Sequence, residues 1–76
     1  LKTVETVCYE IMREIVRVHH AYDSDRFLVY VSPAVGEALK TDESHALAEV
    51  EIFVGKQVKV QIEPLYTQEQ FDVVMM

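Results

Sequence analysis

The segment "RFLVYVSP", residues 26–33, limits the fold of this chain more than any other feature. Phe27 to Val31 are apolar without interruption, which is typical of a strand covered on both faces. Ser32 is a good N-cap residue, and Pro33 suits the first position of a helix. The segment therefore predicts a strand that passes directly into a helix.

A long helix is predicted before this strand. Its apolar positions advance alternately by four and three residues and so form one stripe: Val4, Cys8, Ile11, Ile15, Val18 and Tyr22. Thr3 is the expected N-cap, and Glu5 lies near the positive end of the helix dipole. The solvent face is expected to carry Glu10, Arg13, Glu14 and Arg17.

The helix after the strand is predicted to be short. Its apolar stripe consists of Ala34, Val35, Ala38 and Leu39, and it ends near Thr41 and Asp42. Either of these two residues is expected to cap a further helix, because both side chains can accept a hydrogen bond from a backbone amide.

Residues 46–62 allow two interpretations. A β-hairpin with its turn at Gly55 is predicted by alternating apolar residues on both sides of the glycine. These are Val50, Ile52 and Val54 before it, and Val58, Val60 and Ile62 after it. Leu47, Val50 and Val54 are also spaced as on a helix, with Gly55 at the C-cap. The periodicity leaves both interpretations open. Pro64 is expected to end the strand 58–62, and "QFDVVMM" predicts a last strand.

Size and charge restrict the class of protein. The 76 residues suffice for one domain, and thirteen Asp and Glu against seven Lys and Arg give a net charge of −6, unfavourable for RNA binding by this chain alone. The single cysteine, Cys8, excludes an internal disulfide and favours a cytoplasmic location. No apolar run approaches a membrane span of roughly 20 residues, so no membrane partner is expected. A start without methionine suggests a piece of a longer protein.

Few residues point to chemistry. "HHAYDSD", residues 19–25, holds metal-binding side chains, but adjacent His19 and His20 point about 100° apart on a helix, so a helix end and a turn are predicted. Cys8 is predicted to be a core thiol, and His45 a lone surface residue. No catalytic or metal site is therefore expected. Lys56 and Lys59, with Gln57 and Gln61, form a weak candidate face for RNA phosphates.

Two longer segments resemble the ribonuclease E/G family. "LAEVEIFVGKQVKVQIEPLYTQEQFDVVMM" resembles its C-terminal end, with a leucine-bearing helix, a glycine, a strand and "EQF" followed by an acidic residue. These match residues 47–51, Gly55, residues 58–62 and residues 69–72. "KTVETVCYEIMREIVRVHHAYDSDRFLVYVSP" resembles the preceding helix and strand. The resemblance covers nearly the whole chain.

The resemblance implies a helix up to Gly55 and a strand after it. The fold expected is a single α+β domain over residues 1–76, in the order α-β-α-α-β-β, with helices packed on a three-stranded mixed sheet. Strands 27–31 and 58–62 are expected to be parallel neighbours joined by a right-handed crossover, and the last strand to run antiparallel.

The resemblance also implies a parent enzyme, meaning a longer endoribonuclease of which this chain is the small C-terminal domain. Such hydrolases cleave single-stranded RNA in ribosomal RNA maturation, at the 5′ end of 16S RNA, and in messenger decay. Their magnesium-binding aspartates and zinc-binding cysteines lie upstream, so no cofactor is expected here and Cys8 inherits no role. The domain is expected to help assemble the oligomer through other protomers or upstream domains. A module that itself contacts RNA or a protein partner is the alternative.

The last strand is the expected contact surface. In "FDVVMM", Phe71, Val73 and Met75 point to one face and Asp72, Val74 and Met76 to the other, so one packed face cannot bury both apolar sets. The strand is also expected at a sheet edge. The predicted interface comprises Phe71, Val73, Val74, Met75 and Met76, with Val74 and Met76 facing the partner. A frayed tail is the alternative.

Overall fold

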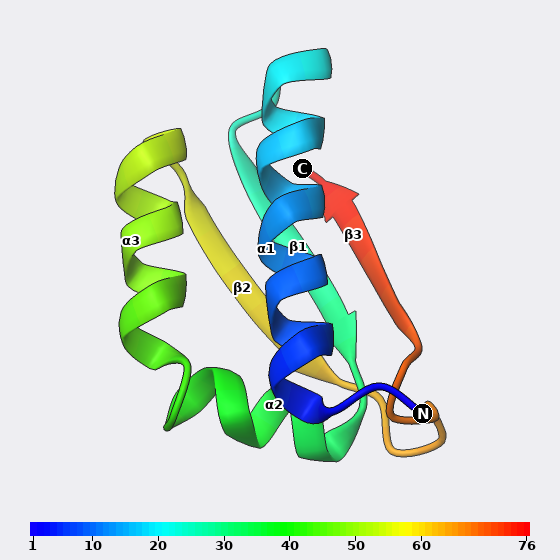
Figure 1. The fold of residues 1–76 in the computed structure, drawn as a ribbon. Helices are drawn as coiled ribbons and strands as arrows, with labels where there is room; N and C mark the ends of the chain where they lie inside the picture. The colour runs from blue at the N-terminus through cyan, green and yellow to red at the C-terminus, as the bar shows by residue number, and fades with distance from the viewer.

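The computed structural model describes all residues 1–76. Its elements are α1 (Val4–Ala21), β1 (Arg26–Val31), α2 (Pro33–Lys40), α3 (Ser44–Val54), β2 (Gln57–Ile62) and β3 (Phe71–Met75). The predicted α+β class and element order are confirmed (Figure 1). None of the three helices has both the length and the apolar character needed to cross a membrane.

Strand β1 lies in the middle of the sheet, whose order is β2-β1-β3. It runs parallel to β2, with Phe27 opposite Val58, and antiparallel to β3, with Phe27 opposite Met75. The mixed sheet is therefore as predicted, and α2 and α3 form the connection between its parallel strands. The prediction that the last strand lies at an edge is also confirmed.

Helix α1 has the N-cap and the charged solvent face predicted for it. The Thr6 backbone amide donates to Thr3 Oγ1 at 3.1 Å, and Arg17 Nε lies 2.6 Å from Glu14 Oε1 on the solvent face. The buried stripe is wrong in one position, because the chain leaves the helix at Tyr22. This residue has extended backbone angles, caps the helix, and is 58% exposed.

All three helices lie on one face of the sheet (Figure 1). Phe27, Val29 and Val31 of β1 point towards them and are fully buried, whereas Leu28 and Tyr30 point the other way and are only partly buried. The expectation that β1 is covered on both faces is therefore wrong. Its apolar run arises because alternate side chains serve two different surfaces, one packed and one open.

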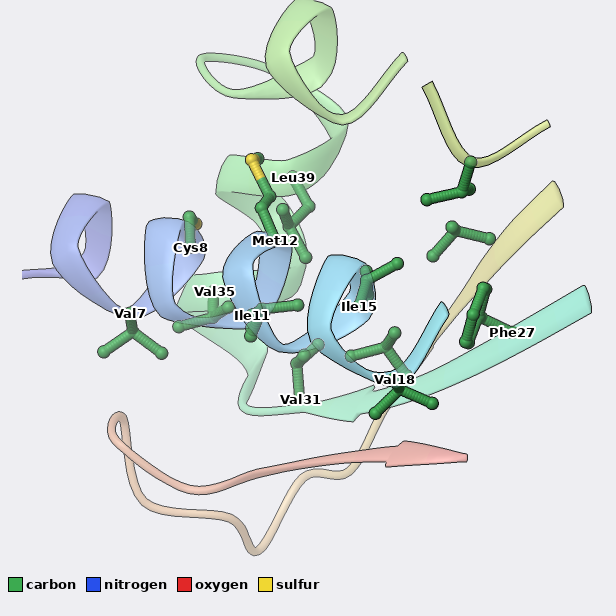
Figure 2. Packing of buried hydrophobic residues seen from close by; sticks show 13 residues of the cluster. Val7, Cys8, Ile11, Met12, Ile15, Val18, Phe27, Val31, Val35 and Leu39 are labelled. Carbon is green, nitrogen blue, oxygen red and sulfur yellow. The ribbon is translucent and has the colours of Figure 1, made fainter. Parts of the chain in front are cut away.

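The core is a cluster of 13 buried residues between the three helices and the sheet, with Val54 as the member from α3. Figure 2 shows Ile11, Ile15 and Val18 of α1 directed towards β1, with Val35 and Leu39 of α2 beside them. Helix α2 begins as predicted, with the Ser32 hydroxyl accepting from the Val35 amide. In its predicted stripe, however, Ala34 is exposed.

The open question over residues 46–62 is settled in favour of a helix. Helix α3 ends at Gly55, whose φ of 69° is left-handed and suits a glycine C-cap, so the hairpin interpretation is wrong. The expected N-cap is also wrong. Glu43 occupies that position without a side-chain hydrogen bond, because Thr41 instead ends α2.

Candidate functional site

The face of the sheet that carries no helix has no packing partner within this chain, and we call it the open face. The strand register places nine side chains there: Arg26, Leu28 and Tyr30 of β1, Gln57, Lys59 and Gln61 of β2, and Asp72, Val74 and Met76 on the β3 side. Met76 follows β3 and continues the pairing, because its amide donates to the Arg26 carbonyl at 2.9 Å.

These side chains form three rows across the strands. The first row contains Gln57, Arg26 and Met76, the second Lys59, Leu28 and Val74, and the third Gln61, Tyr30 and Asp72. The open face therefore has an apolar centre at Leu28 and Val74. Its cations lie in the first two rows, and its carboxylate lies in the third.

The predicted interface residues divide between the two faces of β3. Phe71 and Val73 are half-buried against the core. Val74 and Met76 lie on the open face and are 39% and 52% exposed. The register shows the predicted alternation, because Val73 lies opposite the buried Val29 and Val74 lies opposite Leu28. Met75 is paired opposite Phe27 but remains partly exposed at the sheet edge.

A hollow lies at the cationic end of the open face. Five of the seven residues that line it belong to the open face, and the other two are Phe27 and Val58; the five are Arg26, Leu28, Gln57, Lys59 and Met76. Lys59 thus shares the face with Gln57, as the sequence suggested, but Lys56 does not. Lys56 Nζ lies 3.3 Å from His19 Nδ1 and 5.7 Å from the centre of the Phe27 ring. The structure therefore brings only one of the two candidate lysines to this surface.

The acidic end of the open face is held by a side-chain hydrogen bond. Tyr66 Oη donates to Asp72 Oδ2 at 2.6 Å. This bond raises the pKa of Tyr66 to about 12, because the neighbouring carboxylate opposes formation of the phenolate. Glu63 lies in the same shallow hollow, together with Tyr30 and Val74. Negative charge is therefore concentrated here.

The segment "HHAYDSD" is a helix end and a turn, as predicted. His19 contacts Lys56, and the His20 ring meets Phe53 edge-on at 6.3 Å between centroids. Nowhere do three or more His, Cys, Asp or Glu side chains gather as a metal ion would require. The residues of this chain thus do not fit the magnesium and zinc sites implied for the parent enzyme.

The other two reactive side chains also have structural surroundings. Cys8 is fully buried, as predicted, and burial raises the pKa of its thiol to about 11. His45 is exposed and not alone, because its Nε2 lies 2.9 Å from Glu49 Oε1.

Sequence reasoning missed Arg26, Leu28 and Tyr30 as parts of the candidate surface. The expectation that β1 is covered on both faces implied that these three side chains are buried. The polar positions Gln57, Lys59 and Gln61 gave the available indication, because a strand with every second residue polar points that face to solvent. A neighbouring strand in register must share the same open face.

No protein-family model matches the chain. Over its full length of 76 residues, the chain is 91% identical to ribonuclease G of Salmonella typhimurium (strain SL1344) and of Escherichia coli (strain K12). It is 65% identical to ribonuclease G of Haemophilus influenzae over 77 aligned positions. The chain spans 16% of the length of these relatives. The resemblance inferred from the sequence is thus confirmed along the whole chain.

Proposed function

We propose that this chain is the non-catalytic C-terminal assembly domain of a ribonuclease G, an endoribonuclease. The full-length enzyme would cleave single-stranded RNA in ribosomal RNA maturation and messenger decay, in the cytoplasm, with its magnesium site outside this chain. The identity of 91% to ribonuclease G along all 76 residues supports the assignment of the parent enzyme.

The observation that carries the assembly role is the exposure of apolar side chains on the open face. Val74 and Met76 lie there beside Leu28, and no element of this chain covers them. Burying a Val or Met side chain fully is worth roughly 1.5–3 kcal/mol, so covering the exposed parts of these two would contribute about 2 kcal/mol. A contact with another protomer or with an upstream domain would bury the exposed parts of Val74 and Met76.

The test uses the full-length enzyme with Val74→Lys and Met76→Lys combined. We expect its mass in analytical ultracentrifugation to fall below that of the unchanged enzyme, because two buried ammonium groups oppose the contact. Leu65→Lys is the matched control, since Leu65 is 96% exposed in a loop outside the open face. An unchanged mass in the double variant, with circular dichroism showing a folded protein, would exclude a protomer contact through this face.

A second function, direct RNA contact, is favoured by one observation. Arg26 and Lys59 line the same hollow, and cations of this kind bind phosphate groups. Lys59→Gln should then weaken binding of the full-length enzyme to single-stranded RNA. The affinity of this variant for RNA should also depend less steeply on salt concentration. Lys40→Gln, which changes an exposed lysine at the end of α2, is the control.

A further inference from the structure

We propose that the outer edge of β3 binds an acidic peptide segment of another protein, which adds to the sheet as a further strand antiparallel to β3. The binding surface is the row of backbone groups along this edge, together with the α1 side chains beside it. The inference goes beyond the assembly function, because the partner is a different protein and it contacts an edge of the sheet rather than the open face.

The hydrogen-bond pattern shows which backbone groups of β3 lie on its outer edge. Arg26 and Met76 exchange two backbone hydrogen bonds, with N to O distances of 2.9 and 3.3 Å. In an antiparallel ladder such bonded pairs alternate with pairs that are not bonded to each other. Phe71, Val73 and Met75 therefore direct their N–H and C=O groups away from β1. These groups are free, because β3 is an edge strand and no loop of the chain bonds to them.

The β3 strand lacks the main features that protect edge strands from pairing. It contains no proline and no lysine, and its register with β1 is continuous over residues 71–75, so it has no bulge. Its one charged side chain, Asp72, is held on the open face by the hydrogen bond from Tyr66. The outer edge is therefore available along its whole length, about 13 Å at roughly 3.3 Å per residue.

The opposite edge of the sheet, formed by β2, is partly occupied by side chains. The amide of Val58 donates to Glu51 Oε2 at 2.7 Å, which removes one outward donor. At the other end of β2, Gln61 Nε2 lies 3.4 Å from the carbonyl oxygen of Ile62. The two edges thus differ, and β3 is the one suited to strand addition.

The α1 side of the β3 edge favours a negatively charged partner. Phe71 shares a hollow with four charged residues of α1, namely Glu10, Arg13, Glu14 and Arg17. Glu14 is paired with Arg17 at 2.6 Å, and Glu10 is paired with Lys2 at 2.9 Å. Arg13 belongs to no ion pair of the structure. The hollow therefore contains one cation that is not neutralised, although the net charge of the chain is −6.

An added strand would use the free backbone groups and the free cation together. Its residues opposite Phe71, Val73 and Met75 would exchange backbone hydrogen bonds with them and direct their side chains to the α1 side. A carboxylate at these positions can pair with Arg13. The alternate side chains would extend the open face beside Val74, where an apolar residue fits. The partner is therefore an extended segment with acidic residues at every second position.

The test measures binding of the fluorescently labelled peptide acetyl-Glu-Val-Glu-Thr-Glu-amide to the full-length enzyme by fluorescence anisotropy. N-methylation of the central Glu removes an N–H group that faces Val73, whereas N-methylation of the Thr removes one that faces solvent. We expect the first change to raise the Kd about tenfold or more, as for the loss of a hydrogen bond, and the second to leave it nearly unchanged. The reverse order of effects would contradict the antiparallel arrangement.

Two variants of the enzyme separate the backbone contribution from the charge contribution. Val73→Pro removes an outward N–H that makes no bond to β1, so it should weaken peptide binding about tenfold while the sheet remains folded. Arg13→Glu should weaken binding of the Glu peptide and strengthen binding of a peptide with Lys at the three Glu positions. Lys40→Glu makes the same change of charge at an exposed residue of α2 and should alter neither affinity. Circular dichroism checks the folding of each variant, and the N-methylated peptides test the same hydrogen bond without changing the protein.

Hydrogen–deuterium exchange in the full-length enzyme shows whether the edge is free. The amides of Phe71, Val73 and Met75 should exchange rapidly in the enzyme alone and slowly with saturating peptide. If they are protected without peptide, the enzyme itself covers this edge and the inference is wrong. It is also overturned if the Glu peptide does not bind at about 1 mM, or if the Lys peptide binds the unchanged enzyme more tightly. The assembly function is tested separately, by the mass of the enzyme.

Discussion

Replacing Gly36 by alanine tests how closely α2 is packed on the sheet. Gly36 is buried in α2, and a Cβ atom added there would lie 2.5 Å from Ile62 Cγ1 and 2.8 Å from its Cδ1. Such distances are too short for carbon atoms, so Ile62 at the end of β2 would have to move. The absence of a side chain at residue 36 is thus what permits the close approach of helix and strand.

Two effects of opposite sign determine the result. Alanine is preferred over glycine in a helix by about 1 kcal/mol, whereas overpacking a core costs about 1–3 kcal/mol. We expect Gly36→Ala to lower the free energy of unfolding by about 1 kcal/mol. When Ile62 is also alanine, the two shortest contacts disappear and only Val31 Cγ2 remains near the added Cβ, at 3.3 Å, so the same change should raise the free energy of unfolding by up to about 1 kcal/mol. The coupling between the two positions is then up to about 2 kcal/mol.

Urea unfolding followed by circular dichroism measures all four members of this cycle. A chain of this size has a total stability of about 4–11 kcal/mol, so the variants should remain folded. Gly55→Ala is the control, because its cost arises from a left-handed φ of 69° with no atom near the added Cβ. That cost should be the same whether residue 62 is Ile or Ala. If Gly36→Ala has the same effect in both backgrounds, the close contact described here is wrong.

Two further predictions concern the Tyr66 side chain and the two histidines at the end of α1. Because folding raises the pKa of Tyr66 from 10.0 to about 12, its contribution to stability is present below pH 10 and is lost as the pH rises towards 12. Spectrophotometric titration should show this late ionisation in the unchanged chain and an earlier one in Asp72→Asn; identical curves would contradict the hydrogen bond. Replacing His19 and His20 together by Gln should leave zinc binding unchanged in calorimetry and alter stability by about 1 kcal/mol or less. Stoichiometric zinc binding that disappears in this variant would show that the helix end is a metal site.

Local patterns predicted most of the helices and strands because their causes are local. The N-caps at Thr3 and Ser32 and the apolar stripe of α1 depend on residues within a few positions of one another. Residues 46–62 could not be assigned in this way, since their apolar residues satisfy both the helical and the strand period. The resemblance decided for the helix, and the left-handed backbone of Gly55 gives the physical reason.

The candidate surface was predictable only in part, because half of it depends on contacts between distant residues. Alternation along β3 correctly separated Val74 and Met76 from Phe71 and Val73. The side chains that lie beside Val74 are set by the register between β3 and β1. This register cannot be inferred from the residues of β3 alone. The continuous apolar run of β1 was misleading, because it does not reveal how many layers cover a strand.

The central position of β1 in the sheet also affects how the chain folds. Phe27 pairs with one residue about 30 positions later and with another nearly 50 positions later, so both neighbours of β1 are reached only by closing long segments of the chain. We therefore expect folding on the millisecond-to-second scale typical of long-range pairing, and a single cooperative transition in which both edge strands are lost together.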